Sequence, residues 1–179
     1  LLYPCFCSRA DLHAAQAPHA SDGAYVYAGT CRNLSQSEHE ELSAHKIPAT
    51  RMQVSNTIYT FEDRIYGPTS QNLAKSCGDF IVQRADGVFA YQLAVVVDDA
   101  DMGITEVVRG SDLLSSTPRQ LYLQDMLDLS HPTYAHFPLL VAPDGRRLSK
   151  RNHDLDLGVL RDQGKTPEEI LGFLAYCAG

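Results

Sequence analysis

Three cysteines near the start of the chain have the residue type that a metal site needs. Cys5-x-Cys7 places two thiols in a tight turn, and Cys31 supplies a third from a turn-rich segment. Thiolates are strong zinc ligands, and a tetrahedral structural site needs four donors. Tyr27 is the nearest fourth donor, and imidazole, the commoner ligand, is available from His13, His19 and His39. The alternative is three ordinary reduced cysteines, because one residue is a short spacer for a zinc pair.

Two residues in the middle of the chain could recognise a carboxylate. Arg109 ends the apolar segment 104–109, where its guanidinium could donate two parallel hydrogen bonds to a carboxylate. Tyr91 offers a hydroxyl on an otherwise apolar segment. The alternative interpretation places Tyr91 in the core and Arg109 at the surface.

A basic segment follows the turn Pro143-Asp-Gly145. Its cations are Arg146, Arg147, Lys150 and Arg151. A phosphate-rich ligand would bind better there than elsewhere on the chain, and the alternative is a solvated loop. The net charge of −7 argues against nucleic-acid binding by bulk attraction but does not exclude a local basic patch.

Composition is that of an ordinary globular protein. The 179 residues, 44% of them hydrophobic and 21% charged, fit one domain or one and a half. No segment approaches the roughly 20 apolar residues that a membrane span needs, so no membrane partner is expected. Five cysteines, an odd number, argue against a disulfide framework, and a reducing cytoplasm is the expected compartment. The first residues lack a signal-peptide pattern and resemble a chain that begins in the middle of a domain.

Local signals predict an α/β arrangement. The box Ser35-x-x-Glu38 predicts a helix that ends by Pro48, and Thr166 with Glu169 predicts a helix at the end of the chain. Thr117 is predicted to cap another helix, with a proline at its first position. Short strands are predicted within 51–66 and at 80–84, 104–109 and 137–141. The segment 88–98 fits either a strand or a helix by periodicity.

The order and spacing of three segments resemble the second half of the catalytic domain of glutamyl-type class I aminoacyl-tRNA synthetases. The segments are Tyr91-Gln-Leu-Ala-Val-Val-Val-Asp-Asp99, Val107-Val-Arg-Gly-Ser-Asp112 and Arg147-Leu-Ser-Lys-Arg151. The resemblance implies the second half of a Rossmann-like nucleotide-binding domain, with a helix at 88–98. It divides the chain into a zinc module (1–34), an insertion with the second half of the catalytic domain (35–142), and a signature loop with the start of a helical stem-contact region (143–179).

The resemblance also implies roles for individual residues. Arg147, Leu148, Ser149, Lys150 and Arg151 resemble the Lys-Met-Ser-Lys-Ser loop that closes over ATP, although an arginine stands where the signature begins with lysine. Lys150 would then stabilise the charge that develops as pyrophosphate leaves, and Ser149 would donate a hydrogen bond to a phosphate.

Two further sites follow from the same resemblance. Tyr91 and Arg109 match residues that bind glutamate, and Asp98 with Asp99 match an acidic pair without an assigned role. The order Cys-x-Cys and then Tyr-x-x-x-Cys matches the family members that carry zinc. Its members here, which would hold a structural Zn2+, are Cys5, Cys7, Tyr27 and Cys31.

Within this family, Val95 and Asn152-His153 resemble the short branch called glutamyl-Q tRNA(Asp) synthetase. The implied reaction joins glutamate and ATP, with Mg2+, into glutamyl-adenylate, and then transfers glutamate to the queuosine of tRNA(Asp). The alternatives are a glutamyl-tRNA synthetase charging tRNA(Glu), and a zinc-stabilised binding module without catalysis. No His-x-Gly-His-type ATP motif is found in the sequence, so this chain is expected to be a fragment that is inactive alone. The protein is separately expected to be a monomer.

Overall fold

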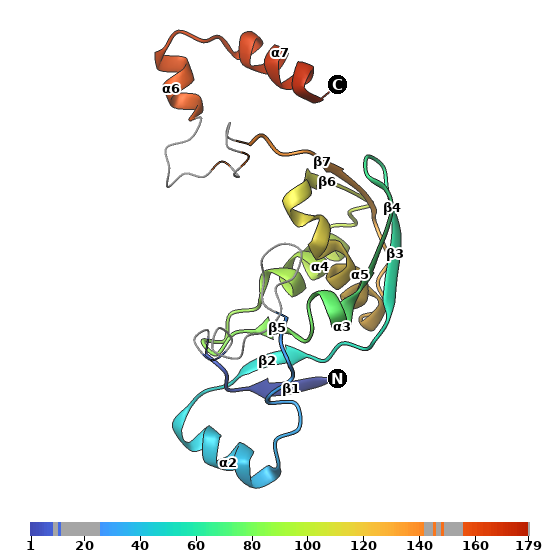
Figure 1. Ribbon diagram of the computed structural model, residues 1–179, viewed down its shortest axis with the longest axis vertical. Coiled ribbons are helices and arrows are strands. Elements are labelled where there is room, and N and C mark those ends of the chain that lie inside the picture. The colour runs from blue at the N-terminus through green and yellow to red at the C-terminus, as the bar shows by residue number, and fades with distance from the viewer. Residues whose placement is uncertain (9–10, 12–25, 142–144, 146–147, 149–155, 179) are drawn as a thin grey trace.

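The computed structural model describes residues 1–8, 11, 26–141, 145, 148 and 156–178. Two sheets form the middle of the molecule (Figure 1). The first is antiparallel, in the order β1-β2-β5, and consists of β1 (Leu2–Cys5), β2 (Ala49–Met52) and β5 (Phe80–Gln83). The second has the order β4-β3-β7-β6 and consists of β3 (Ile58–Asp63), β4 (Gly67–Asn72), β6 (Glu106–Gly110) and β7 (Thr133–Phe137).

Helices surround these sheets at three places. The central ones are α3 (Leu73–Ser76), α4 (Tyr91–Asp101), the 3-10 helix η1 (Ser111–Ser116) and α5 (Thr117–Met126). Figure 1 shows α2 (Gln36–His45) at one end of the molecule, and α6 (Leu157–Asp162) with α7 (Pro167–Ala178) at the opposite end. Among the described residues, no helix is both long and apolar enough to cross a membrane.

Among the described residues, most of the buried apolar side chains form two clusters. The larger one joins the first sheet to the central helices and contains Met52, Val54, Leu73, Phe80, Val82, Val96, Tyr122 and Leu123. The smaller one lies beside β1 and contains Cys5, Phe6, Tyr27 and Cys31. Residues with chemistry in their side chains therefore make up most of the second cluster, whereas the first is an ordinary hydrophobic core.

Local signals correctly predicted several elements. The capping box of Ser35 and Glu38 opens α2, and Thr166 with Glu169 makes the same pair of hydrogen bonds before α7. β5 and β6 lie where strands were predicted, with small shifts of their ends. The ambiguous segment 88–98 is helical from Tyr91 onward, as the family resemblance implied.

Two predictions were wrong. Thr117 is not an N-cap: η1 runs directly into α5, and Thr117 is fully buried with its hydroxyl bonded to Arg109. The strand predicted at 137–141 lies earlier, as β7, because Pro138 has no N–H with which to continue the ladder. No pattern in the sequence predicted β4, which is a polar edge strand. Pro68 is tolerated in it because, among the described residues, β4 pairs with another strand on one side alone.

The pairing of the second sheet decides which residues meet near Arg109. β6 and β7 are parallel, and their register sets Arg109 opposite His136. β3 meets β7 on the other side through the pair Asp63 and Tyr134. Asp63, His136 and Arg109 are thereby brought together from three strands.

Candidate functional site

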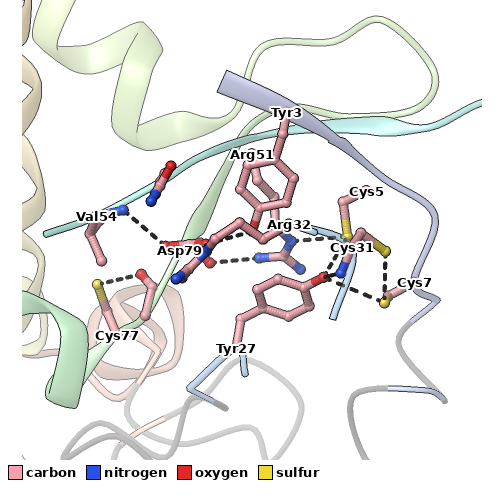
Figure 2. Close-up of polar contacts among 12 residues, drawn as sticks. Tyr3, Cys5, Cys7, Tyr27, Cys31, Arg32, Arg51, Val54, Cys77 and Asp79 are labelled. Carbon is pink, nitrogen blue, oxygen red and sulfur yellow. Dashed lines mark hydrogen bonds and ion pairs between the residues drawn. The ribbon is translucent and has the colours of Figure 1, made fainter. Parts of the chain in front are cut away.

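The three cysteine sulfurs lie together, as their spacing predicted. Their Sγ atoms are all within 4.8 Å of one another, and those of Cys7 and Cys31 are 3.5 Å apart. The hydroxyl of Tyr27 lies 3.5 Å from Cys5 Sγ and 3.7 Å from Cys7 Sγ (Figure 2). Cys5 ends β1 and Cys7 follows it two residues later, whereas Tyr27 precedes the turn at 30–33 and Cys31 lies within that turn.

The backbone fixes the position of Tyr27 in this cluster. Its hydroxyl accepts a hydrogen bond of 2.8 Å from the backbone N–H of Cys31. Its main chain forms an isolated bridge with Gly78, where a Cβ would lie 2.6 Å from the Tyr27 carbonyl oxygen. Only glycine fits this approach, and Gly78 also has a positive φ of 61°. The ring of Tyr27 is therefore held in place from two directions.

Arg51 gives the cluster a buried positive charge. Its side chain, 4% exposed, stacks with its guanidinium carbon 3.7 Å from the centre of the Tyr27 ring. Its Nε donates to Cys5 Sγ at 3.1 Å, and its Nη1 donates to the carbonyl of Asp79 at 2.8 Å. A cation beside the sulfurs stabilises thiolates, which are the form that binds metal.

Asp79 anchors the surroundings of the cluster. Its carboxylate accepts hydrogen bonds from the Tyr3 hydroxyl at 2.6 Å, from Arg32 at 2.6 and 2.8 Å, and from the backbone N–H of Val54 at 2.9 Å. The side chain is fully buried, while Arg32 is partly exposed. Asp79 therefore connects β1, the turn after Cys31 and the end of β2 around the sulfurs.

The donor set fits a structural zinc ion. Sulfurs bound to one tetrahedral zinc lie about 3.8 Å apart, from Zn–S bonds of about 2.3 Å. The sulfur separations here, and the distances from Tyr27 to two of the sulfurs, fall around that value. Three thiols and one phenol would complete four positions, so the arrangement could hold a metal without a further protein ligand. Of the histidine alternatives, His39 packs edge-on against Phe6, and His13 and His19 lie outside the described residues.

The proton affinities of these groups differ. Burial by itself raises the pKa of the Cys5 thiol, but hydrogen bonds with Tyr27 and Arg51 outweigh it and leave that pKa below its ordinary value. Burial raises the pKa of Cys7 to about 11 and, together with contacts to the sulfurs, raises the pKa of Tyr27 further still. Without a cation among them, Cys7 and Tyr27 would therefore keep their protons at neutral pH.

The second candidate site is centred on Arg109, which was predicted to bind a carboxylate together with Tyr91. Its Nε donates to His136 Nε2 at 3.0 Å, and its Nη2 donates to Thr117 Oγ1 at 2.9 Å and to Gln120 Oε1 at 2.7 Å. Its guanidinium carbon lies 5.4 Å from the centre of the Tyr134 ring. All these acceptors are neutral, and burial lowers the pKa of Arg109. Within the described residues, the guanidinium is thus half-buried without an ion pair.

Tyr91 lies beside Arg109, at the start of α4. Burial lowers the pKa of Arg109, and the interaction of the Tyr91 hydroxyl with the guanidinium offsets only part of that effect. Tyr91 is 53% exposed, so the alternative that it packs in the core is wrong. The alternative of Arg109 as a surface residue fails as well, because three side chains hold it. Together they form a polar cluster where α4, α5 and β6 meet.

Asp63 and His136 lie behind Arg109 and were not found by sequence reasoning. Both side chains are fully buried, and His136 Nδ1 lies 2.6 Å from Asp63 Oδ2. Burial by itself raises the pKa of Asp63, but hydrogen bonds from His136 and from backbone amides outweigh it and lower that pKa to about 2. His136 lies outside the strand predicted at 137–141, and its partner becomes evident only from the pairing of β7 with its neighbours.

The basic loop lies mostly outside the described residues. Of its five members, Arg147, Ser149, Lys150 and Arg151 are not described, and Leu148 is half-buried. Leu148 lines an apolar pocket together with Leu140 and residues of α6 and α7. The assignment of Lys150 to the reacting phosphates stays a prediction.

Known proteins with similar sequences identify the family of this chain. The model of the catalytic domain of class I tRNA synthetases (E and Q) matches residues 1–177. Two glutamyl-Q tRNA(Asp) synthetases each match 99% of this chain and 56% of their own length: that of Nitratidesulfovibrio vulgaris is 48% identical and that of Symbiobacterium thermophilum 49%. The chain therefore spans about half the length of these curated relatives.

Solved structures lead to the same family. A glutamate-tRNA synthetase from Elizabethkingia anophelis superimposes with a TM-score of 0.66 at 27% identity, over 86% of this chain and 33% of that chain. A glutamate tRNA ligase from Elizabethkingia meningosepticum, solved in complex with its amino acid, gives 0.65 at 27% identity, over 86% and 32%. The chain belongs to the class I tRNA synthetases of the E and Q type, within their catalytic domain.

Proposed function

We propose that this chain is the part of a glutamyl-Q tRNA(Asp) synthetase that recognises glutamate and contributes the ATP loop. In the intact protein, glutamate and ATP with Mg2+ would give glutamyl-adenylate and pyrophosphate, and the glutamyl group would then pass to the queuosine of tRNA(Asp). The relatives named above support this acceptor, because they carry that name at nearly half identity.

The half-buried guanidinium of Arg109 carries the proposal. A buried cation that contacts only neutral acceptors is poorly compensated, and a carboxylate ligand would supply the missing charge. Glutamate has an α-carboxylate and a second carboxylate on its side chain, and Arg109 could bind either one through two parallel hydrogen bonds. Tyr91 stands in the same polar cluster and would hydrogen-bond the substrate beside Arg109.

In this proposal, the basic loop binds the phosphates of ATP and stabilises the charge that develops on them. Lys150 would stabilise the charge on the departing pyrophosphate, and Ser149 would donate to a phosphate oxygen. Arg147, Leu148 and Arg151 would complete the loop over the triphosphate, with Arg147 providing the cation of the first signature position.

We further propose that Cys5, Cys7, Tyr27 and Cys31 hold a structural Zn2+. When bound, the ion would join β1 to the turn around Cys31 and replace the protons of Cys7 and Tyr27. Arg51 would offset part of the negative charge that three thiolates and a phenolate leave around a divalent cation. Measurement of zinc per molecule in the purified intact protein tests this assignment.

The experiment for the proposed activity is glutamate-dependent exchange of pyrophosphate into ATP by the intact protein without tRNA. Exchange without tRNA is the expected result for the queuosine-directed branch. Transfer of labelled glutamate is then measured to tRNA(Asp) with queuosine and to the same tRNA with guanine in its place. Only the modified tRNA should accept glutamate.

The second candidate is a glutamyl-tRNA synthetase, which the structural matches favour. That enzyme would show exchange only after addition of tRNA(Glu), and it would load glutamate onto that tRNA. Absence of exchange under both conditions would contradict both activities and favour the zinc-stabilised binding module.

A further inference from the structure

The hydrogen bonds behind Arg109 form a chain that ends in a buried carboxylate. Asp63 Oδ2 lies 2.6 Å from His136 Nδ1, and His136 Nε2 accepts the Nε–H of Arg109 at 3.0 Å. Asp63 and His136 are both fully buried, so solvent does not compete for either contact. The three residues come from β3, β7 and β6, and the register of the strands places them in line.

This chain fixes the tautomer of His136. The Nε–H of an arginine can only donate, so His136 Nε2 must accept and carries no proton. The ring proton is therefore on Nδ1, where it is donated to Asp63. The carboxylate of Asp63 thus determines whether His136 can hold Arg109.

We propose that Asp63 and His136 are positioning residues for substrate recognition: they hold Arg109 so that its guanidinium faces the glutamate site. This proposal rests on the proposed role of Arg109 in binding glutamate. The hydrogen bonds of Arg109 to His136, Leu113, Thr117 and Gln120 use its Nε and Nη2, so none of these four bonds occupies Nη1. An arginine already fixed in this way loses less conformational freedom when a carboxylate binds.

Replacement of Asp63 by asparagine gives a specific test, because the surroundings fix the orientation of the new amide. Asp63 Oδ1 accepts the backbone N–H groups of Ile65 and Tyr66, each at 3.0 Å, and of His136 at 3.2 Å. The amide oxygen must take that position, so the amide N–H2 faces His136 Nδ1. His136 would then accept at Nδ1 and carry its proton on Nε2, where it opposes the N–H of Arg109.

The experiment measures glutamate-dependent ATP–pyrophosphate exchange by the intact protein and its Asp63→Asn variant. The KM for glutamate should rise about 10- to 100-fold, as expected for the loss of one hydrogen bond to a charged group, while the KM for ATP stays the same. In 15N-histidine-labelled protein, the His136 signals should change from the Nδ1–H to the Nε2–H tautomer. A purely structural role for Asp63 would not change the tautomer and the two KM values in this pattern.

A matched control is available in the same chain. Asp125 forms a second carboxylate–imidazole pair with His131 at 2.8 Å, but this pair is exposed and does not contact Arg109. Asp125→Asn should leave the KM for glutamate and the His136 tautomer as in the unmodified protein. An equal rise in KM for both variants would overturn the proposal.

A second pair of variants covers the case in which Asp63→Asn fails to fold. His136→Gln can place an amide oxygen where Nε2 was, whereas His136→Leu has no acceptor there. The glutamine variant should keep a KM for glutamate closer to that of the unmodified protein than the leucine variant does. Equal values for the two would overturn the proposal. Absence of any exchange by the unmodified protein would instead contradict the proposed function on which it rests.

Discussion

Two arginines pack against a tyrosine ring but differ in what balances their charge. They are the buried Arg51 at the sulfur cluster and the half-buried Arg109 at the polar site. Arg51 lies 3.7 Å from the centre of the Tyr27 ring and donates to Cys5 Sγ, a group that can become an anion. Arg109 lies 5.4 Å from the Tyr134 ring and donates to neutral acceptors. The first guanidinium has a group beside it that can balance its charge, whereas the second has no ion pair among the described residues, which is why we propose that it binds an anionic ligand.

This difference suggests a structural role for Arg51 and agrees with the proposed binding role of Arg109. Arg51 is almost completely buried and contacts Cys5, Tyr27 and Asp79, so its loss should destabilise the sulfur cluster. Arg109 is half-buried and lies beside the exposed Tyr91, so under the proposed function its loss should weaken ligand binding. Substitutions at the two positions should therefore change different measured quantities.

The largest effect is expected from Arg109→Met. It removes the proposed carboxylate-binding group but keeps most of the side-chain volume. Loss of one partner of a desolvated charge pair costs about 2–5 kcal/mol, which is roughly a 30- to 4000-fold loss of kcat/KM for glutamate. Arg84→Met is the matched control, since Arg84 is 61% exposed and pairs only with the nearby Asp86. Equal activity of the two variants in pyrophosphate exchange would contradict the assignment of Arg109.

The next effect is expected from Cys31→Ser in the sulfur cluster. Removal of one of the three clustered thiols should lower the zinc content of the purified intact protein from about one ion per molecule toward zero. The melting temperature should fall as well, because metal binding stabilises the folded state. Cys177→Ser is the control, since Cys177 is exposed on α7. A folded unmodified protein without metal would contradict the zinc site.

The sequence allowed prediction of those parts of the fold and site that depend on neighbouring residues. The capping boxes of α2 and α7 were readable because Ser35 and Thr166 bond to glutamates three residues later. The grouping of Tyr27 with Cys31 was readable for the same reason, since only four residues separate them. The grouping of Cys5 and Cys7 with Cys31 was suggested by their residue type and turn-rich surroundings, and a residue pattern known from the family strengthened it.

Contacts between distant segments were not predictable in this way. Asp63 and His136 are 73 residues apart, and the carbonyl of Asp79 that binds Arg51 is 28 residues away. Such pairs meet because strands pair in one register, and no local pattern states which register that is. Thr117 illustrates the error that follows: its position before Pro118 predicted a cap, but a contact with Arg109 decides its role.

A smaller effect is expected from Arg51→Met. The sulfur ligands remain in place, but the cation beside them is lost, and the carbonyl of Asp79 loses its donor. Groups that contact metal ligands change metal affinity by about 10- to 100-fold when they are removed. Competition with a chromogenic chelator would measure this decrease, with the exposed Arg64→Met as control. An unchanged zinc affinity would show that Arg51 acts only in packing.

The smallest effect concerns the pH dependence of stability. The pKa of Asp63 is lowered to about 2 in the folded protein, against about 3.9 in an unfolded chain. The folded state therefore favours the carboxylate, and the resulting stabilisation of about 2 kcal/mol is present above about pH 4 and is lost as the pH falls toward 2. Asp63→Asn cannot titrate and lacks this dependence.

Urea unfolding of the two proteins at several pH values measures it. The difference in free energy of unfolding between the unmodified protein and Asp63→Asn should be largest above about pH 5 and should shrink by about 2 kcal/mol as the pH falls to about 2. A constant difference over that range would mean that His136 and the backbone amides do not stabilise the charged form of Asp63. In that case Asp63 would lack the charge that fixes the His136 proton on Nδ1, and His136 would not hold Arg109 in position. The contrast between Arg51, whose charge is balanced within the protein, and Arg109, which is held ready for a ligand, would then fail for Arg109.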